Sequence, residues 1–311
     1  MDNREHTGKE PRIAIRNVLI LGAGTMGLQI GLQCAASGFE VMIYDPFEQA
    51  LEKAQQRLGS LAGRMAGANR ITPEQAEAGA SRMQFSSDPV AAGKNADFIN
   101  ESIPEDPALK QKVFATFNEI CPAHTVFTTN TSTLVPSTIA EATGRPDRFA
   151  AFHFHDCMLT NVVDIMPHPG TSPDTLEVTR EFCRAIGQFP VELKKEQNGY
   201  VFNAMLGKLL EAALALAAKD VADVADIDRA WMGIMRTGSG PFGIMDAIGL
   251  GTVYKVTDYW AEKRDDAQAR KSAAFLKTYV DRGDLGVKTG KGFYSYPRPA
   301  FMSSEFMQGI R

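Results

Sequence analysis

The chain has 311 residues, of which 44% are hydrophobic, so it is long enough for two globular domains and too apolar for a fibrous or disordered protein. Its 33 basic and 37 acidic residues give a formal charge of −4 without a basic cluster, which argues against nucleic acid as a partner. Four scattered cysteines without a CxxC pair favour free thiols in a reducing compartment, and we expect a cytoplasmic protein.

The N-terminal segment, residues 1–16, is charged and polar and lacks the apolar stretch of a secretory signal. We expect a flexible tail there. The most apolar helical stretch, Leu209 to Ala218, contains Glu211 and is shorter than the roughly 20 residues that cross a bilayer. We therefore expect no membrane association.

Residues 17–197 alternate short β-branched segments with longer amphipathic segments, a pattern that predicts βαβ units and a doubly wound parallel sheet. The predicted strands are Val18–Leu21, Glu40–Tyr44, Phe98–Asn100, Thr125–Thr129, Phe149–Phe154, Val162–Met166 and Val191–Lys194.

A glycine-rich turn, Gly-Ala-Gly-Thr-Met-Gly, follows the first predicted strand and opens an apolar-periodic helix. Gly22 permits the tight turn, Gly24 lets backbone amides approach a pyrophosphate, and Gly27 lets the helix pack closely on the strand. The motif and its context predict a Rossmann-type dinucleotide-binding domain. The expected cofactor contacts in this turn are Gly22, Gly24, Thr25, Met26 and Gly27.

The second predicted strand ends at Asp45. A carboxylate here can accept hydrogen bonds from the adenosine ribose hydroxyls and would repel a 2′-phosphate, so we expect NAD rather than NADP. The alternative is a surface Asp45 that caps the helix starting at Pro46.

Two later helices carry start signals. Thr72 is followed by Pro73 and, three positions after Thr72, by Gln75, which is the pattern of a capping box. Ser172 and the proline after it open another helical segment, which Gly187 ends.

Polar residues suited to acid–base chemistry follow two further strands. The segment Asn130-Thr131-Ser132-Thr133 lies at the carboxyl edge, where doubly wound sheets bind ligands, although it also suits a helix cap. In Phe152-His153-Phe154-His155, alternation predicts both histidines on one face of a strand and both phenylalanines on the other. The pattern alone leaves a structural and a catalytic role open for these histidines.

From residue 198 the strand patterns end, and residues 198–311 predict a second, all-α domain. The predicted helices are Tyr200–Ala218, Ile227–Met235, Phe242–Ile248, Thr252–Arg264 and Ser272–Arg282. Neither an internal repeat nor a low-complexity linker separates the two domains.

These segments together resemble the L-3-hydroxyacyl-CoA dehydrogenase family, with its 3-hydroxybutyryl-CoA dehydrogenase, diketoreductase and lambda-crystallin relatives. The likeness extends over nearly the whole chain after Arg16. The matching segments are the glycine turn with Asp45, residues 101–105 with Lys110, Asn130-Thr131-Ser132, His153-Phe154, and residues 199–203, 240–246 and 288–294.

The resemblance implies an NAD-dependent oxidoreductase that interconverts a 3-hydroxyacyl-CoA and a 3-ketoacyl-CoA. It makes His153 the general base, and imidazole suits this role because its unperturbed pKa of about 6.5 allows proton exchange near neutral pH. It also implies that Ser132 and Asn203 hydrogen-bond the substrate oxygen and that Asp164 orients the imidazole.

Further cofactor contacts and the assembly are implied by the same resemblance. The additional residues expected at the cofactor are Glu105, Lys110, Ser132, Asp156 and Lys288. The expected partner besides the small-molecule substrate is a second copy of the chain, in a homodimer formed through the C-terminal helices. The first of these, Tyr200–Ala218, has apolar residues around most of its circumference, which is more than one packing face requires.

Three features depart from the family's usual pattern. Where the family commonly has His-Phe-Phe-Asn-Pro, this chain has His153-Phe154-His155-Asp156-Cys157. The stretch to Asp164 is one residue short and ends in Asp instead of Glu, so the loop between base and orienting carboxylate must differ. The segment after Asp45 is also poor in the cations that would bind CoA phosphates, which are limited to Lys53, Arg57, Arg64 and Arg70.

These departures leave alternatives. His155, Asp156 and Cys157 are competent metal ligands, but a histidine base needs no ion and we expect no metal. If its substrate carries no CoA group, the chain would reduce free 3-keto or diketo acids or oxidise a hydroxy acid. A third interpretation is a crystallin-like NAD-binding protein without catalysis. The retention of Ser132, His153 and Asn203 argues against it. Acyl chain length and physiological direction stay open.

Overall fold

The computed structural model describes residues 15–309, which form two compact units, one ending at Val201 and the other beginning at Phe202. The predicted tail, residues 1–16, lies outside the described residues up to residue 14. The first unit contains an eight-stranded sheet in the order β3-β2-β1-β4-β5-β6-β7-β8. Its strands are β1 (Asn17–Leu21), β2 (Glu40–Tyr44), β3 (Met83–Ser86), β4 (Phe98–Glu101), β5 (Val126–Thr129), β6 (Phe149–Phe154), β7 (Val162–Met166) and β8 (Phe189–Glu192).

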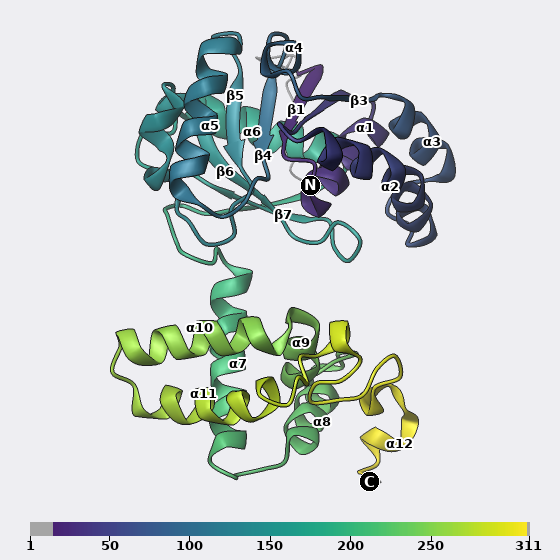
Figure 1. Ribbon diagram of the computed structural model, residues 1–311, viewed down its shortest axis with the longest axis vertical. Coiled ribbons are helices and arrows are strands. Elements are labelled where there is room, and N and C mark those ends of the chain that lie inside the picture. The colour runs from purple at the N-terminus through teal and green to yellow at the C-terminus, as the bar shows by residue number, and fades with distance from the viewer. Residues whose placement is uncertain (1–14, 310–311) are drawn as a thin grey trace, which may run out of the picture. The chain divides into compact units, whose positions relative to one another are not determined.

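Helices cover both faces of this sheet (Figure 1). They are α1 (Thr25–Ala36), α2 (Glu48–Gly67), α3 (Pro73–Ser81), α4 (Pro89–Gly93), α5 (Pro107–Ile120) and α6 (Pro173–Ala185), with 3-10 turns η1 (Pro136–Thr138), η2 (Ala140–Thr143) and η3 (Pro146–Arg148). The two predicted start signals are confirmed, because Thr72 forms a capping box with Gln75 and the Ser172 hydroxyl accepts a hydrogen bond from the Thr175 amide.

Strand β1 shows why the sheet is covered on both sides. Its residues alternate between two apolar cores, with Val18 and Ile20 in one and Leu19 and Leu21 in the other. The first core includes residues of α1, α2 and α6, and the second includes residues of α4 and α5. A central strand buried on both faces must be apolar at every position, as parallel strands in doubly wound folds are.

The sheet departs from the sequence-based prediction at three places. Strand β3 was not predicted, and β8 begins at Phe189, two residues before the predicted start. All neighbouring strands are parallel except β6 and β7, which run antiparallel. Only residues 155–161 connect β6 to β7, and a parallel crossover needs about a dozen residues or more, so this connection forces the antiparallel pairing.

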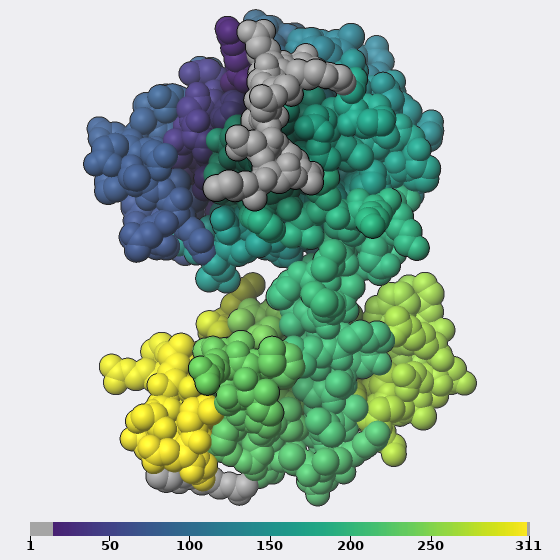
Figure 2. All heavy atoms as spheres, turned by 180° about the vertical axis from the view of Figure 1, so that it is seen from behind, coloured from purple at the N-terminus to yellow at the C-terminus, as the bar shows by residue number. Residues whose placement is uncertain are grey.

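The second unit is helical, as predicted. Its elements are α7 (Phe202–Ala218), α8 (Val224–Met235), α9 (Pro241–Ile248), α10 (Leu250–Lys263), α11 (Ala267–Val280) and α12 (Ser304–Met307), with 3-10 turns η4 (Val287–Thr289) and η5 (Ala300–Met302). Helix α12 lies against α8, and the Arg229 guanidinium donates a 2.5 Å hydrogen bond to the Phe306 carbonyl. In Figure 2, the yellow C-terminal segment lies beside green helical segments of the same unit. Among residues 15–309, none of the helices is long and apolar enough to cross a membrane.

Two buried aspartates hold the helical unit together. Asp228 accepts hydrogen bonds from the amides of Phe242 and Gly243, which begin α9, and from the Tyr294 hydroxyl. Asp246, in α9, accepts bonds from the amides of Phe293 and Tyr294. The conspicuous segments 240–246 and 288–294 therefore contact each other inside this unit, where they have a structural role.

Candidate active site

The glycine turn between β1 and α1 fits a bound dinucleotide. Gly22 has φ +108°, and a Cβ there would lie 2.7 Å from the Ser102 carbonyl oxygen. A Cβ on Gly27 would lie 2.0 Å from the Gly22 oxygen, so the helix passes the turn as closely as predicted. Gly24 is exposed, and within the described part of the chain its Cβ position has no atom within 4 Å and no side chain caps α1. The turn thus offers helix amides and open space to a pyrophosphate.

Asp45 is joined to this turn. One of its carboxylate oxygens accepts a 3.0 Å hydrogen bond from the Ala23 amide, and the other accepts a 3.1 Å bond from the Phe47 amide before α2. Each carboxylate oxygen can accept a further bond, so the side chain keeps acceptor capacity for the hydroxyls of a ribose. The strand end and the glycine turn therefore form one surface, as the spacing predicts.

A buried lysine lies between two glutamates beyond β4. Lys110, 1% exposed, contacts the Glu101 carboxylate at 2.6 Å and the Glu105 carboxylate at 3.2 Å. Glu105 also accepts hydrogen bonds from the hydroxyls of Thr131 and Thr133. The cluster therefore joins the predicted cofactor contacts Glu105 and Lys110 to the segment that carries Ser132.

The two glutamates differ in their ionisation. Burial raises the pKa of Glu101 above its ordinary value, although Lys110 opposes this shift. Burial also acts on Glu105, but hydrogen bonds from Thr131 and Thr133 and the charge of Lys110 outweigh it and hold its pKa below the ordinary value. Glu105 is thus an ionised acceptor at the exposed side of the cluster.

His153 and Asp164 face each other across the antiparallel strands β6 and β7. They are direct partners in the strand register, and His153 Nδ1 lies 3.2 Å from Asp164 Oδ2. Both side chains are buried, His153 at 5% and Asp164 at 1% exposure. The shorter connection and the shorter carboxylate side chain therefore still bring the predicted base and its orienting group together.

The alternation predicted for this segment is confirmed. Phe152 and Phe154 belong to the apolar core, whereas the rings of His153 and His155 lie 4.8 Å apart on the other side of the strand. His155 Nε2 lies 3.0 Å from Asp164 Oδ2, the same oxygen that His153 contacts. Burial raises the pKa of Asp164, but hydrogen bonds from His153 and His155 and the charge of these rings outweigh it and leave the pKa below its ordinary value.

Tyr200 connects His153 to the segment of Ser132. Its ring stacks on the imidazole of His153 with centroids 4.5 Å apart and planes 9° apart. Its hydroxyl donates a 2.6 Å hydrogen bond to the Thr131 carbonyl, next to the exposed Ser132. Asn130 makes a second connection, because its side-chain oxygen accepts a 2.7 Å bond from the Phe154 amide. Ser132 and His153 thus lie on segments fixed to each other.

The three remaining predicted site residues are Asp156, Asn203 and Lys288. Asp156 is exposed, and its carboxylate accepts a 2.9 Å hydrogen bond from the Met158 amide in the turn after β6. Asn203 lies in the first turn of α7, and Lys288 is exposed in η4. Both belong to the helical unit, and their contribution to the site stays a prediction.

The structure gathers a different set of metal-competent residues from the one considered in the sequence. Cys157 is buried in the apolar core, where burial raises the pKa of its thiol to about 12, so it is a poor ligand. His153, His155 and Asp164 instead offer three atoms within 4.8 Å of one another. Their mutual hydrogen bonds account for this grouping without an ion, and the absence of a metal remains a prediction.

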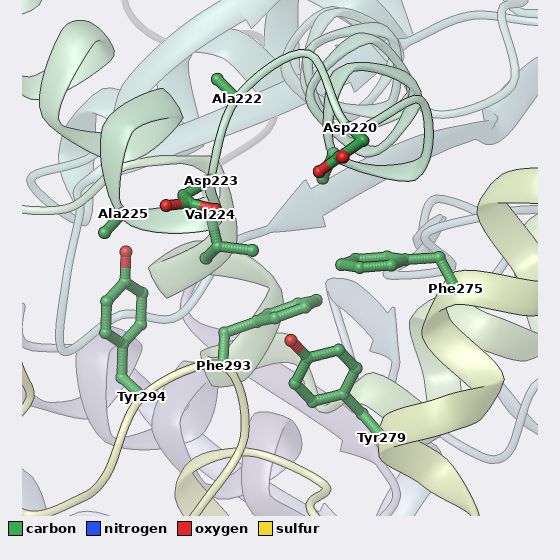
Figure 3. Close-up of a pocket in the computed structure, with 10 residues that line it drawn as sticks. Asp220, Ala222, Asp223, Val224, Ala225, Phe275, Tyr279, Phe293 and Tyr294 are labelled. Carbon is green, nitrogen blue, oxygen red and sulfur yellow. The ribbon is translucent and has the colours of Figure 1, made fainter.

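A separate hollow of about 330 Å³ lies in the helical unit. Figure 3 shows the rings of Phe275, Tyr279 and Phe293 gathered on one side of it, with Asp220 on another. None of the residues predicted for catalysis or cofactor binding lines this hollow.

Glu101, Tyr200 and the second histidine contact of Asp164 were not predicted as parts of the site. Glu101 ends β4 on the same edge as Asp45 and Asn130, so its position at a strand end was a usable signal. Tyr200, near the end of the first unit, has an unusual backbone conformation with φ +52°, and its stacking on His153 depends on tertiary structure.

Comparisons with known proteins agree with this geometry. Residues 17–197 match the family model described as 3-hydroxyacyl-CoA dehydrogenase, NAD binding domain, and residues 199–296 match the C-terminal domain of the same family. Mitochondrial hydroxyacyl-coenzyme A dehydrogenase from Rattus norvegicus is 32% identical over 295 residues, covering 92% of each chain. A probable 3-hydroxybutyryl-CoA dehydrogenase from Bacillus subtilis is 30% identical, covering 91% of this chain and 98% of the relative.

A solved structure adds a relative with another substrate. A diketoreductase, whose structure is described as showing dual catalysis of dicarbonyl compounds, is 38% identical with a TM-score of 0.84. The match covers 91% of this chain and 99% of that chain.

Proposed function

Since the chain belongs to the 3-hydroxyacyl-CoA dehydrogenase family of NAD-dependent oxidoreductases acting on CH–OH groups, we propose that it interconverts a 3-hydroxyacyl-CoA and the matching 3-ketoacyl-CoA. His153 is the general acid–base in this proposal. The observation that carries it is the buried contact of 3.2 Å between His153 Nδ1 and Asp164 Oδ2 beside the segment of Ser132.

The contact with Asp164 assigns the two ring nitrogens of His153 to different tasks. The pKa of Asp164 lies below its ordinary value, so the carboxylate is ionised near neutral pH and accepts a hydrogen bond from Nδ1–H. Nε2 then removes the hydroxyl proton in oxidation and returns it in reduction. The negative charge of Asp164 stabilises the imidazolium formed when Nε2 takes up the proton. When bound, the cofactor would supply the hydride chemistry at carbon 3 of the substrate, as the acceptor in its oxidised form NAD and as the donor in its reduced form NADH.

Ser132 and Asn203 hold the reacting oxygen in this proposal. Ser132 lies on a segment tied to His153 through Tyr200 and Asn130, so its position relative to the base is fixed. Asn203 donates its side-chain amide from α7. Two donors at the oxygen would orient carbon 3 for transfer and stabilise negative charge on the oxygen.

The cofactor site extends from the glycine turn to the glutamate–lysine cluster. Asp45 would hold the adenosine ribose, and the amides that begin α1 would hold the pyrophosphate. The family resemblance adds four further cofactor contacts, which are Glu105, Lys110, Asp156 and Lys288. The open Gly24 and the remaining acceptor capacity of Asp45 support this arrangement.

Replacing the base tests the proposal. His153→Asn keeps a side-chain amide near Asp164 but cannot exchange a proton, so kcat should fall by about 10²–10⁴-fold, while NADH affinity should change little. Turnover with acetoacetyl-CoA and NADH measures the first effect, and NADH fluorescence titration measures the second. A variant with more than a tenth of wild-type turnover would refute His153 as the base.

A second candidate is the reduction of free dicarbonyl or 3-keto acids without CoA. It is favoured by the 38% identity to the diketoreductase. It is also favoured by hydrogen bonds that two of the arginines expected to bind CoA make within the chain. Arg57 donates a 3.3 Å hydrogen bond to the Thr25 hydroxyl, and Arg70 donates a 3.1 Å bond to the Met158 carbonyl. Each of these bonds occupies a guanidinium group that we expected to bind CoA phosphates. Arg64 and Lys53, on α2, are exposed and still available to such phosphates.

The proposed assembly is a homodimer formed through the helical unit, in the cytoplasm. Helices α7, α8 and α10 expose large apolar side chains, which supports a protein surface as their partner. The most exposed of these are Phe202, Met205, Ile234, Met235, Val256 and Tyr259.

A further inference from the structure

Two histidines share one oxygen of a buried carboxylate. Asp164 Oδ2 lies 3.2 Å from Nδ1 of His153 and 3.0 Å from Nε2 of His155. The Asp164 side chain is 1% exposed, and those of His153 and His155 are 6% and 15% exposed. Water therefore has little access to this oxygen, and both ring contacts act on it at short range in a poorly screened environment.

Both ring nitrogens donate to Asp164. The pKa of Asp164 is below its ordinary value, and an ionised carboxylate only accepts hydrogen bonds. His155 therefore carries its proton on Nε2, as His153 carries one on Nδ1. Each donated bond draws negative charge from the same oxygen. Each bond therefore weakens the electrostatic stabilisation that the carboxylate gives to the other ring.

We propose that His155 is a positioning residue that fixes the Asp164 carboxylate and weakens its support of protonated His153, so that His153 releases its proton at a lower pH. The inference rests on the proposed role of His153 as base. A carboxylate that binds only His153 stabilises the imidazolium more strongly and makes a weaker acid of it. When His155 is itself protonated, its positive charge 4.8 Å from the other ring acts in the same direction.

Other ionisable groups surround this cluster. Tyr200 stacks on His153, and burial together with the charges of Asp164, Glu105 and Glu101 raises its pKa, so the phenol stays a neutral donor to Thr131. The two glutamates are balanced in part by Lys110. Asp156, next to His155 in the chain, is exposed and bonded to the Met158 amide. None of these groups changes in the variants of His155 used below.

Two variants of His155 distinguish the effect of its hydrogen bond to Asp164 from the effect of its ring volume. His155→Phe keeps the volume of a ring and removes the donor, whereas His155→Gln places an amide nitrogen near the position of Nε2 and keeps the donor. His124→Phe is a matched control, because His124 Nε2 contacts Asp97 Oδ1 at 2.9 Å at the opposite, amino-terminal edge of the sheet.

The first measurement is the pH profile of kcat/KM for oxidation of 3-hydroxybutyryl-CoA at saturating NAD. Oxidation needs neutral His153, so activity falls as the pH falls through its pKa. In His155→Phe, this acid limb should move to higher pH by about 0.5–1 unit. At pH values below the limb, kcat/KM should then be roughly three- to tenfold lower than in the wild type. His155→Gln should lie closer to the wild type, and His124→Phe should coincide with it.

The second measurement follows the ring itself. Histidine side-chain ¹H–¹⁵N spectra of the full chain, with the His153 signals assigned by their loss in His153→Asn, report the titration of His153 without turnover. The pKa should rise in His155→Phe by the same amount as the acid limb. An unchanged pKa and limb in His155→Phe, or equal shifts in the Phe and Gln variants, would overturn the inference. If His153→Asn is active, the proposed function fails instead, and the spectra still report the coupling between the two rings.

Discussion

At the scale of single residues, we expect Asp45 to decide between the two nicotinamide cofactors. Its carboxylate accepts a bond from the Ala23 amide and is therefore held against the glycine turn, where we expect it to meet the 2′ position of the adenosine ribose. Asp45→Ser removes the repulsion and Asp45→Arg adds attraction. We expect the ratio of kcat/KM for NADH over NADPH to fall by at least tenfold in the Arg variant.

Steady-state rates with both cofactors measure this ratio, and Asp266→Ser serves as the control. Asp266 also accepts backbone amide bonds before a helix, but that helix is α11 of the helical unit. Equal rates of the unmodified chain with NADH and NADPH would show that Asp45 does not exclude the phosphate.

The sequence predicted the site where chemistry follows from local spacing. The glycine turn, Asp45 and the alternating histidines need only the chain order of strand, turn and helix. Tyr200 was not assigned a function in this way because its partner is distant in sequence, and His155 was not because its contact with Asp164 depends on strand pairing. The contact of Tyr200 with Thr131 spans 69 positions, and the shared oxygen of Asp164 appears only once β6 and β7 are paired.

At the scale of elements, the missed strand and the reversed pair have physical reasons. Strand β3 is a four-residue edge strand with a single buried residue, Met83, so it lacks the apolar run of a central strand. Strand β8 is the other edge, and there Pro190 is tolerated because one side of the strand needs no donor. The antiparallel β6–β7 pair was predictable from its short connection, and it is this pairing that sets His153 opposite Asp164.

The cations of helix α2 allow a test that distinguishes a CoA thioester from a free keto acid as substrate. Its apolar face is buried, and Lys53, Arg57 and Arg64 are exposed on the other face. If CoA phosphates lie along α2, Arg64→Ala should raise KM for acetoacetyl-CoA roughly two- to fivefold, as an exposed ion pair of up to about 1 kcal/mol allows. The effect should weaken with added salt, and KM for acetoacetate should stay constant.

The same assay compares the substrates directly. We expect the unmodified chain to reduce acetoacetyl-CoA faster than acetoacetate or a diketo ester at equal concentration. Lys94→Ala is the control, because Lys94 is an exposed cation after α4, on the opposite face of the sheet from α1 and α6. Faster turnover of the diketo ester, together with an unchanged KM in Arg64→Ala, would replace the CoA proposal with the dicarbonyl one.

At the scale of the whole molecule, each of the two units has its own core. The sheet unit contains the glycine turn, His153 and Asp164, and we expect the helical unit to contribute Asn203 and Lys288. In the helical unit, Asp228 and Asp246 stabilise the packing, because their hydrogen bonds join segments far apart in sequence. The resemblance at segments 240–246 and 288–294 therefore reflects structural constraints.

The exposed apolar surface of the helical unit predicts a dimer. Ile234 on α8 is 81% exposed and Val256 on α10 is 53% exposed, and burying such side chains against a second copy removes apolar area from water at about 25 cal/mol per Å². Light scattering at micromolar concentration should give twice the mass of one chain. The double variant Ile234→Lys with Val256→Lys should shift this mass toward the monomer, because it places unpaired charges in the interface. Phe189→Lys, at a 60% exposed residue of edge strand β8, should keep the dimer. A monomer mass for the unmodified chain would contradict the proposed assembly, and circular dichroism of each variant distinguishes a lost interface from a lost fold.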